Sequence, residues 1–461
     1  MNDTSIEAIV ELAKAAQAQY EAEGSQARYN RAAQAVAWAI MEPARNRDLA
    51  ELAVQTTGLG NVPDKITKNH RKTFGLMYDL KDAVTFGVMS DDPTSGITEI
   101  ARAKGVVAAI VPSTNPAATP ANNIINALKC GNAIVVAPSP KGVACAERLL
   151  DYIYTEFAKI GEDPNLVQMI PPPGSKEKTQ ALMDACDLIV CTGSQNNVHR
   201  AQTAGTPAVA VGAGNVTVIV DETADLDEAA KKIRASKCFD NATSCSSENS
   251  AVVIDAVYDD FVVAMARAGG ALVDDEDGVV AKLWPNGHLN RSVIAQDAGK
   301  MIAALDLDVP EGTDYIVVPT SGIGPDHPLS GEKLSRVLAL YRASDFDDAV
   351  TVTRRIQRYQ GAGHSVGLHS NDDSRAKALA TAIPTSRVIV NQAHTFATGG
   401  AFTNGMPFSL SMGCGTWGGN SVGENVNYRH FMQSTKIIRE IPSREPSLDA
   451  IFADYWSAAG R

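Results

Sequence analysis

Five continuous apolar runs within residues 105–211 constrain the fold of this chain more than any other feature. Each run is stopped by a proline or a glycine, and helical stretches follow the first, second and third runs. Buried strands that alternate with helices form a parallel, doubly wound sheet. The sequence therefore predicts an α/β fold with strands at Gly105–Val111, Asn132–Ala137, Asn165–Ile170, Asp187–Thr192 and Pro207–Val211, and helices at Ala121–Lys129, Ala144–Ile160 and Lys176–Cys186.

More than one domain is expected, because 461 residues are too many for one ordinary core. The pattern predicts a second segment of the same α/β class. Helices are predicted before residue 54, and the second segment alternates strands with helices from residue 226 to residue 391. Its expected strands are Ala251–Ile254, Tyr315–Val318, Val337–Tyr341, Ser365–Leu368 and Arg387–Asn391, and its helices Leu226–Lys237, Asp259–Ala266, Phe346–Tyr359 and Ser374–Ala382.

The ends of the first set of strands indicate where a ligand binds. In doubly wound sheets, ligands bind beyond the carboxyl ends of the strands. Those ends are Pro112–Asn115, Pro138–Lys141, Gly193–Gln195 and Gly212–Asn215. The first half of the chain is therefore predicted to be a nucleotide-binding domain.

Charge and composition exclude several classes of partner. The chain carries 41 basic and 53 acidic residues, a net charge of −12, which disfavours nucleic acid. It has no apolar stretch long enough to span a membrane and no secretory signal. Seven irregularly spaced cysteines indicate reduced thiols in the cytoplasm, and no zinc motif is present, so no metal is expected. The basic residues within Thr56–Lys72 are interpreted as a solvated helix face: Lys65, Lys68, His70, Arg71 and Lys72.

Cys245 is the candidate nucleophile. It lies in a polar loop, Ser236–Ser250, that runs directly into the apolar strand Ala251–Ile254. A thiolate attacks carbonyl carbon well, and a polar, partly open loop permits ionisation. The alternative for such a residue is a small buried cysteine without chemistry. The polar residues on both sides favour the nucleophile.

Asn115 is the candidate partner of Cys245. Thiolate attack on a carbonyl requires a donor for the developing oxyanion, and an amide at a strand end, together with the Cys245 N–H, supplies one. Taken alone, Asn115 would be a turn-capping residue.

Gly413–Gly418 matches G-x-G-x-x-G, but no helix is predicted after it, so its glycines are interpreted as positions of close backbone approach.

These blocks resemble the CoA-acylating branch of the aldehyde dehydrogenase family over nearly the whole chain. The resemblance implies the aldehyde dehydrogenase fold, and the end at Arg461 predicts no fused alcohol dehydrogenase half. The similar motifs are Asn115-Pro116, Thr192-Gly193-Ser194, Gly205–Asn215, Phe239–Cys245, Leu338–Asp345 and Gly413–Ser421.

The resemblance implies a mechanism. Cys245 attacks the aldehyde, Asn115 and the Cys245 N–H hold the oxyanion, and hydride loss leaves a thioester on Cys245. Hydrolytic relatives then activate water with a glutamate, whose place is taken here by Ala210. Without that base, the thiol of CoA takes the acyl group.

The resemblance also implies a cofactor site. Glu332 matches the glutamate that holds the nicotinamide ribose, and Ser194 is expected near the nicotinamide and the pyrophosphate. The usual ribose lysine after the second strand is absent, and Lys141 is placed to meet a 2′-phosphate, which favours NADP over NAD. The expected cofactor residues are Ser113, Thr114, Pro138, Ser139, Lys141, Thr192, Gly193, Ser194, Gly212, Ala213, Gly214 and Glu332.

Two loops, Asn391–Gly400 and Asn427–Phe431, resemble those of acylating dehydrogenases that act on sulfoacetaldehyde. A sulfonate requires cations or N–H donors, and Arg429, His394 and Arg200 are candidates. The alternatives are a plain aldehyde, such as acetaldehyde or propanal, or a nucleotide-binding acyl-transfer protein without redox chemistry.

The resemblance divides the chain into three parts. Residues 1–221, completed by part of 416–434, are the expected nucleotide-binding domain, and residues 222–415 the expected catalytic domain with Cys245. Residues 435–461 are expected to be an oligomerisation segment that adds a strand to a neighbour. The sequence therefore predicts a homodimer or a homotetramer.

Overall fold

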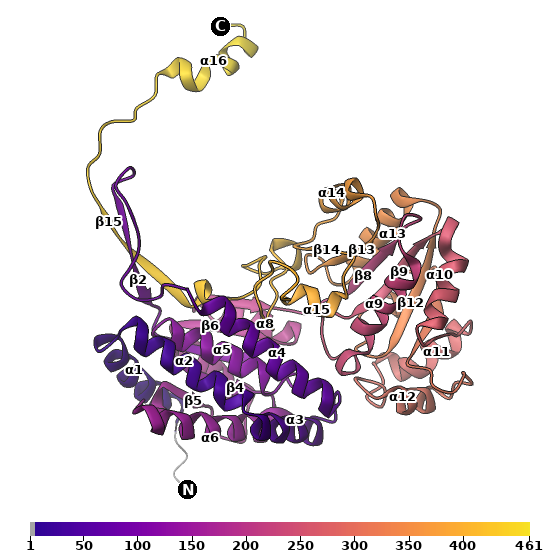
Figure 1. Ribbon diagram of the computed structural model, residues 1–461, viewed down its shortest axis with the longest axis horizontal. Coiled ribbons are helices and arrows are strands. Elements are labelled where there is room, and N and C mark those ends of the chain that lie inside the picture. Colours follow the sequence, from indigo (N-terminus) through magenta and orange to yellow (C-terminus); the bar gives the residue numbers. More distant parts are fainter. Residues whose placement is uncertain (1–4) are drawn as a thin grey trace.

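The structure is a computed structural model that describes residues 5–461. It begins with four helices, α1 (Ile6–Ala22), α2 (Gln26–Met41), α3 (Pro43–Thr57) and α4 (Val62–Leu80). Side chains at the N-caps of α1, α2 and α4 accept backbone N–H groups, which explains where these helices start. α2 buries an alanine-rich face against α4, α5 and α6, so the helices pack closely around the first sheet (Figure 1).

The first sheet has five parallel strands in the order β5-β4-β3-β6-β7. β3 and β4 are buried along their whole length, as continuous apolar runs predict for strands covered on both faces. The strands are β3 (Val106–Val111), β4 (Ala133–Pro138), β5 (Val167–Met169), β6 (Leu188–Thr192) and β7 (Ala208–Val211), and the helices between them are α5 (Ala118–Lys129), α6 (Val143–Ile160), α7 (Lys176–Ala185) and α8 (Gln195–Thr203).

The second sheet has seven parallel strands in the order β10-β11-β12-β9-β8-β13-β14. Separate apolar clusters cover its two faces. The strands are β8 (Val216–Val220), β9 (Glu248–Ile254), β10 (Gly270–Leu272), β11 (Tyr315–Pro319), β12 (Val337–Ala343), β13 (Val366–His369) and β14 (Val388–Val390). The helices are α9 (Leu226–Cys238), α10 (Asp255–Arg267), α11 (Glu276–Leu283), α12 (Ala298–Leu305), α13 (Phe346–Tyr359), α14 (Asp373–Ala382) and α15 (His394–Thr398). The predicted α/β class with doubly wound parallel sheets is confirmed.

One domain boundary needs correction. The predicted first domain ran to residue 221, but β8 pairs with β9 and β13 in the second sheet. The chain crosses between the sheets at Gly212–Asn215. A short apolar run looks the same in the sequence whichever sheet it joins. The sequence pattern therefore could not show that β8 belongs to the second sheet.

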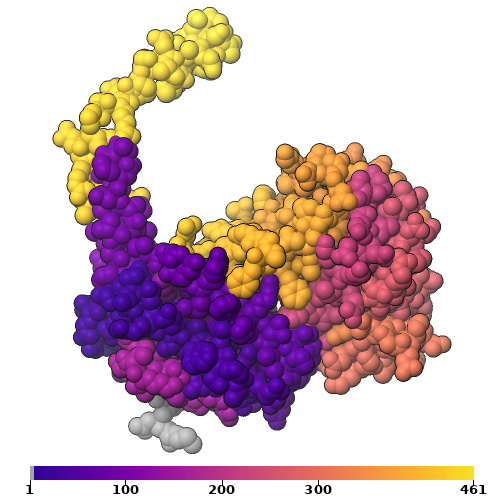
Figure 2. Space-filling view, viewed as in Figure 1, coloured from indigo at the N-terminus to yellow at the C-terminus, as the bar shows by residue number. Residues whose placement is uncertain are grey.

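A third, antiparallel sheet forms an arm that projects from the first domain (Figures 1 and 2). Its order is β1-β2-β15, built from β1 (Val88–Asp92), β2 (Ile97–Ala103) and β15 (Met432–Ile438). Beyond it, α16 (Leu448–Ala458) lies far from both sheets. Just before β15, Val426 and Phe431 pack into the core of the first domain. Among the described helices, none combines the length and apolar character that a bilayer crossing requires.

Candidate active site

Cys245 and Asn115 line one cavity, about 330 Å³ in volume, with walls contributed by both sheets and by the loop after α15. Cys245 lies in a tight turn, closed by a 3.0 Å hydrogen bond from Ser247 N to Ser244 O, at the entrance to β9. Asn115 follows β3. The cavity also contains eight of the predicted cofactor residues: Ser113, Thr114, Thr192, Gly193, Ser194, Gly212, Ala213 and Glu332.

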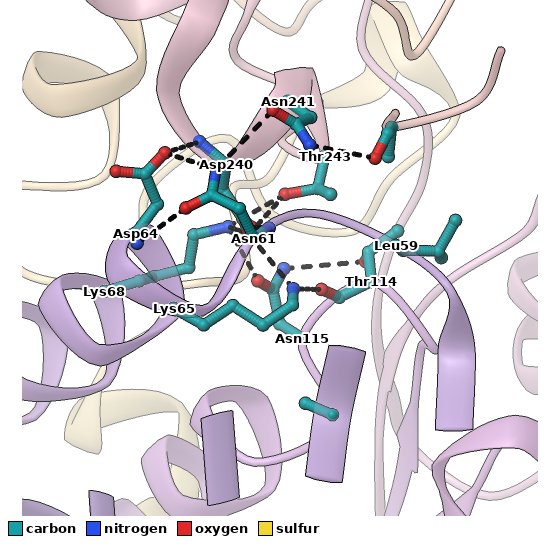
Figure 3. Close-up of polar contacts among 12 residues, drawn as sticks. Leu59, Asn61, Asp64, Lys65, Lys68, Thr114, Asn115, Asp240, Asn241 and Thr243 are labelled. Carbon is teal, nitrogen blue, oxygen red and sulfur yellow. Dashed lines mark hydrogen bonds and ion pairs between the residues drawn. The ribbon is translucent and has the colours of Figure 1, made fainter. Parts of the chain in front are cut away.

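A strained turn leads into Cys245. Asp240, Asn241 and Ala242 have φ values of 48°, 54° and 61°, in the left-handed region that costs energy for residues with a Cβ. Side chains from α4 and its N-cap hold this turn (Figure 3). Asn61 N donates to Asp240 Oδ1 at 3.0 Å, and Asp240 N donates to Asp64 Oδ2 at 2.8 Å.

Asp240 is the centre of a buried ionic network (Figure 3). Lys65 Nζ and Lys68 Nζ donate to Asp240 Oδ2 at 3.1 and 2.5 Å, and Thr243 Oγ1 donates to the same oxygen at 2.7 Å. Burial alone would raise the pKa of Asp240, but the two lysines outweigh it and hold that pKa below its usual value. The carboxylate is therefore ionised, and it joins α4 to the loop of Cys245.

Lys68 also fixes the orientation of Asn115. Its Nζ donates to Asn115 Oδ1 at 2.9 Å, and an ammonium group has donors only. The amide oxygen of Asn115 must therefore face Lys68, and its NH₂ group faces the other way, where its nearest partner is Thr114 Oγ1 at 3.5 Å. This leaves the Asn115 amide able to donate within the cavity.

This network overturns the interpretation of the basic region as a solvated face. Lys65, Lys68 and Lys72 are only 3%, 5% and 7% exposed. Their spacing of three and four residues places them on one face of α4, and that face meets the cavity. The helical spacing of these lysines was the one sign in the sequence that they share a face. Their carboxylate partner could not be recognised, because it lies 172 residues from Lys68 in the sequence.

Burial governs the ionisation of Cys245. The thiol is half-buried, and burial first, then the charge on Glu332, raises its pKa to about 12. Burial also raises the pKa of Glu332 to about 8, so this carboxyl is protonated at pH 7. Among the described residues that line the cavity, Glu332 is the single carboxylic acid. Ala210, at the position of the hydrolytic glutamate, is a buried residue of β7.

The remaining predicted cofactor residues lie outside the cavity wall. Pro138 and Ser139 lie at the carboxyl end of β4, with Ser139 Oγ buried and without a partner among the described residues. Lys141 is exposed beside them, with its Nζ 3.4 Å from Thr57 O. Gly214 packs against the backbone of Cys245, where a side chain would overlap the Cys245 carbonyl.

The structure does not bring the three predicted sulfonate ligands to the cavity. Arg429 is exposed on the first domain, with its Nε 3.4 Å from Tyr428 Oη. Arg200 lies on α8 and donates to Lys176 O and Gln180 Oε1. His394 is buried, with its Nε2 2.8 Å from Ser365 Oγ, and burial lowers its pKa well below the usual value.

Two glycines of Gly413–Gly418, Gly413 and Gly418, are the predicted positions of close backbone approach. A side chain at Gly413 would overlap Val422 O, and one at Gly418 would overlap Cys414. The motif ends in the three-residue turn Thr416–Gly418, and residues 419–427 that follow it form no helix. The motif is therefore not a dinucleotide fingerprint.

Comparisons with known proteins agree with this geometry. The family model "Aldehyde dehydrogenase family" matches residues 1–410. An acylating sulfoacetaldehyde dehydrogenase of Cupriavidus necator is 53% identical over 98% of this chain and 92% of its own. Another, from Bilophila wadsworthia, is 38% identical over 93% of each chain. An acetylating aldehyde dehydrogenase structure from Geobacillus thermoglucosidasius has a TM-score of 0.91 at 30% identity, over 96% of this chain and 98% of that one.

Cys245 and the amide of Asn115 line one cavity between two parallel sheets, an arrangement suited to attack by a thiolate on a carbonyl group with a donor for the oxyanion. The chain belongs to the aldehyde dehydrogenase family, in its CoA-acylating branch. It is an NAD(P)-dependent oxidoreductase.

Proposed function

We propose that this protein oxidises sulfoacetaldehyde with CoA and NADP to sulfoacetyl-CoA and NADPH, through a thioester on Cys245. The observation that carries the chemistry is the cavity shared by Cys245 and Asn115. The aldehyde itself is supported by the 53% identity to the sulfoacetaldehyde dehydrogenase of Cupriavidus necator. The loops Asn391–Gly400 and Asn427–Phe431 resemble that subgroup as well.

In the proposed mechanism, Cys245 reacts as the thiolate: Sγ forms a bond to the aldehyde carbon as the C=O π bond breaks, and the carbonyl oxygen becomes an oxyanion. The Asn115 NH₂ group, turned toward the cavity by Lys68, donates to that oxyanion. The Cys245 N–H makes no hydrogen bond among the described residues and is the second donor. The developing charge is therefore stabilised by groups that are in place before the reaction.

The cavity and the neighbouring strand ends fit a nicotinamide dinucleotide. They supply backbone at Gly193 and Gly212, and the unpartnered Ser139 Oγ is an available hydroxyl at the end of β4. Lys141, exposed there, has the charge for a 2′-phosphate. When bound, the cofactor supplies the hydride acceptor that turns the adduct on Cys245 into a thioester.

The acyl group is then expected to leave on CoA rather than on water. Attack by water requires a general base near the thioester, and Glu332, protonated at pH 7, is the single carboxylic acid of the described cavity wall. A thiol is the better nucleophile without such a base. The products are the acyl-CoA and the free Cys245 thiol.

We further infer a homo-oligomer in the cytoplasm. α16 buries none of its residues and exposes Leu448, Ile451 and Tyr455 by more than 60% each, a surface that a second copy would cover. β15 lies at the edge of its sheet and exposes Ile438 by 74%. All seven cysteines are free thiols, which suits a reducing compartment.

The experiment is a panel of aldehydes with both cofactors. The purified protein is assayed for reduced nicotinamide with sulfoacetaldehyde, acetaldehyde and propanal, each with and without CoA. We expect the highest kcat/KM for sulfoacetaldehyde with NADP, and turnover that depends on CoA. An equal or higher kcat/KM for propanal would show that sulfoacetaldehyde is not the preferred substrate. An unchanged ratio of kcat/KM for NADP to that for NAD in Lys141→Ala would show that Lys141 does not select NADP.

A further inference from the structure

We infer that Arg71, Lys72 and Thr395 form an anion-binding subsite that holds the sulfonate of the substrate in the Cys245 cavity. This inference rests on the proposed function and specifies how the same cavity selects its aldehyde. All three residues line that cavity, on α4 and at α15.

The wall of the cavity carries more basic than acidic side chains. On a chain with a net charge of −12, the cavity wall within residues 5–461 carries three basic residues, Lys68, Arg71 and Lys72, against the single carboxyl of Glu332. Lys68 is compensated by Asp240. Arg71 and Lys72 have no ion pair with a carboxylate in residues 5–461. Buried cations without an anion are unfavourable, so the cavity has the charge of an anion site.

Arg71 is held in place without being neutralised. One of its terminal nitrogens donates to Phe396 O and Gly400 O, both at 2.8 Å. Its guanidinium lies over the rings of Phe396 and Phe408, at 5.0 and 5.7 Å from their centroids. Burial lowers the pKa of Arg71, with no acid acting in the other direction. Its remaining N–H donors are available to a ligand.

Lys72 is also anchored only by carbonyl groups. Its Nζ donates to Gly399 O and, at 3.1 Å, to Ser409 O, which leaves one of three N–H donors free. A side chain at residue 399 would overlap this ammonium group, so only glycine permits the position. Burial, with Arg71 and Lys68 nearby, lowers the pKa of Lys72 well below its usual value. A bound anion would raise this pKa.

Thr395 supplies an independent observation. Its side chain is 6% exposed, and its Oγ1 is buried without a hydrogen-bond partner among the described residues. The backbone of Thr395 is fixed by a 2.8 Å hydrogen bond from its N to Ser236 Oγ. A buried hydroxyl without a partner is costly, and a ligand oxygen in the cavity would satisfy it.

A sulfonate matches this set of donors. It presents three oxygens around sulfur, and a guanidinium, an ammonium and a hydroxyl can each address one of them. In sulfoacetaldehyde one carbon separates the sulfur from the carbonyl carbon, so both ends must lie in one small space. Cys245 and the three subsite residues share the same cavity, and a thiolate at Cys245 would raise the pKa of Lys72.

The test measures specificity as a ratio within each variant. We expect Arg71→Met, Lys72→Met and Thr395→Val to lower the ratio of kcat/KM for sulfoacetaldehyde to that for propanal, roughly 10- to 100-fold for either cation. Arg429→Met removes a cation outside the cavity and is the matched control, with an unchanged ratio. A general structural defect lowers kcat/KM for both substrates together and leaves their ratio unchanged, so the ratio reports the subsite alone. Ratios within about twofold of wild type for both cation variants would overturn the inference.

Inhibition separates this inference from the proposed function. Ethanesulfonate should compete with propanal in wild type, and its Ki should rise at least about tenfold in Arg71→Met, whichever aldehyde is the natural substrate. Propionate at the same concentration tests whether a carboxylate suffices. If wild type prefers propanal yet ethanesulfonate binding depends on Arg71, the proposed substrate fails and the subsite stands. If ethanesulfonate does not compete, the subsite fails.

Discussion

Asn115 and Lys68 illustrate how one donor-only side chain sets the direction of another at the scale of single residues. Lys68 Nζ contacts Asn115 Oδ1, Asp240 Oδ2 and Thr243 Oγ1 at once. Without this ammonium, the Asn115 amide can turn its oxygen toward the oxyanion and repel it. Lys68 is therefore a positioning residue, and its effect on the oxyanion should pass through Asn115.

A double-mutant cycle tests this dependence. We expect Asn115→Ala to lower kcat about 10²–10³-fold, as loss of an oxyanion donor does elsewhere, and Lys68→Met to lower it by a factor of about 10 or more. The double variant should be no slower than Asn115→Ala. Multiplicative losses would show that Lys68 acts independently of Asn115, and circular dichroism of each variant checks that it folds.

The ionisation of Cys245 gives a prediction in pH. Its pKa of about 12 means that the free enzyme carries a thiol at neutral pH. Because only the thiolate reacts, alkylation of Cys245 by iodoacetamide should accelerate about tenfold per unit between pH 7 and pH 10. Glu332 ionises above its pKa of about 8 and then disfavours the thiolate. Above pH 8 the wild-type increase should therefore fall slightly below tenfold per unit, whereas Glu332→Gln should keep the tenfold increase. A plateau near pH 7 in wild type would contradict the raised pKa.

At the scale of elements, the turn Asp240–Ala242 positions Cys245. Three consecutive residues with left-handed backbone conformation lead the chain to Cys245, just before β9. Hydrogen bonds from α4 and its N-cap stabilise them. Glycine adopts this conformation freely but costs entropy when it folds, so Ala242→Gly should change Tm by no more than about 2 °C. Ala242→Val places a β-branched residue at positive φ and should lower both Tm and kcat. Equal stability of the two variants, measured by calorimetry, would show that the turn is not strained.

The elements also show what the sequence could and could not predict. Continuous apolar strands near a proline, such as β3 and β4, lie within one residue of their predicted positions. A strand that is buried on both faces consists of consecutive apolar residues, so the sequence alone identifies it. β9 starts three residues early, at Glu248, because these polar residues are buried against distant partners: Asn249 Oδ1 accepts from Lys333 N at 3.0 Å. The lysines of α4 were misinterpreted for the same reason. Cys245 and Asn115 were recognisable from local motifs, whereas the Arg71–Lys72–Thr395 subsite is assembled only by tertiary contacts.

At the scale of the whole molecule, the arm is the part expected to contact a second copy of the chain, because it projects from the first domain (Figure 1). β15 is retained by β2 within the chain, but α16 contacts neither sheet (Figure 1). Removal of residues 443–461 should therefore leave a folded protein of smaller assembly size, as measured by light scattering after size-exclusion chromatography. Val263→Ser, which removes an exposed apolar side chain on the body, is the control. An unchanged assembly size in the truncated protein would exclude α16 from the interface.

The central claim, that the acyl group rests on one sulfur until a second thiol removes it, is tested most directly by mass spectrometry of a single turnover. Wild type is mixed with sulfoacetaldehyde and NADP without CoA, digested, and the peptide containing Cys245 is analysed; CoA is then added to a parallel sample. We predict one NADPH per active site, a sulfoacetyl group on Cys245, and its transfer to CoA on addition. Cys245→Ser should form neither product. Continued turnover in that variant, or free sulfoacetate as the main product in the presence of CoA, would contradict the account.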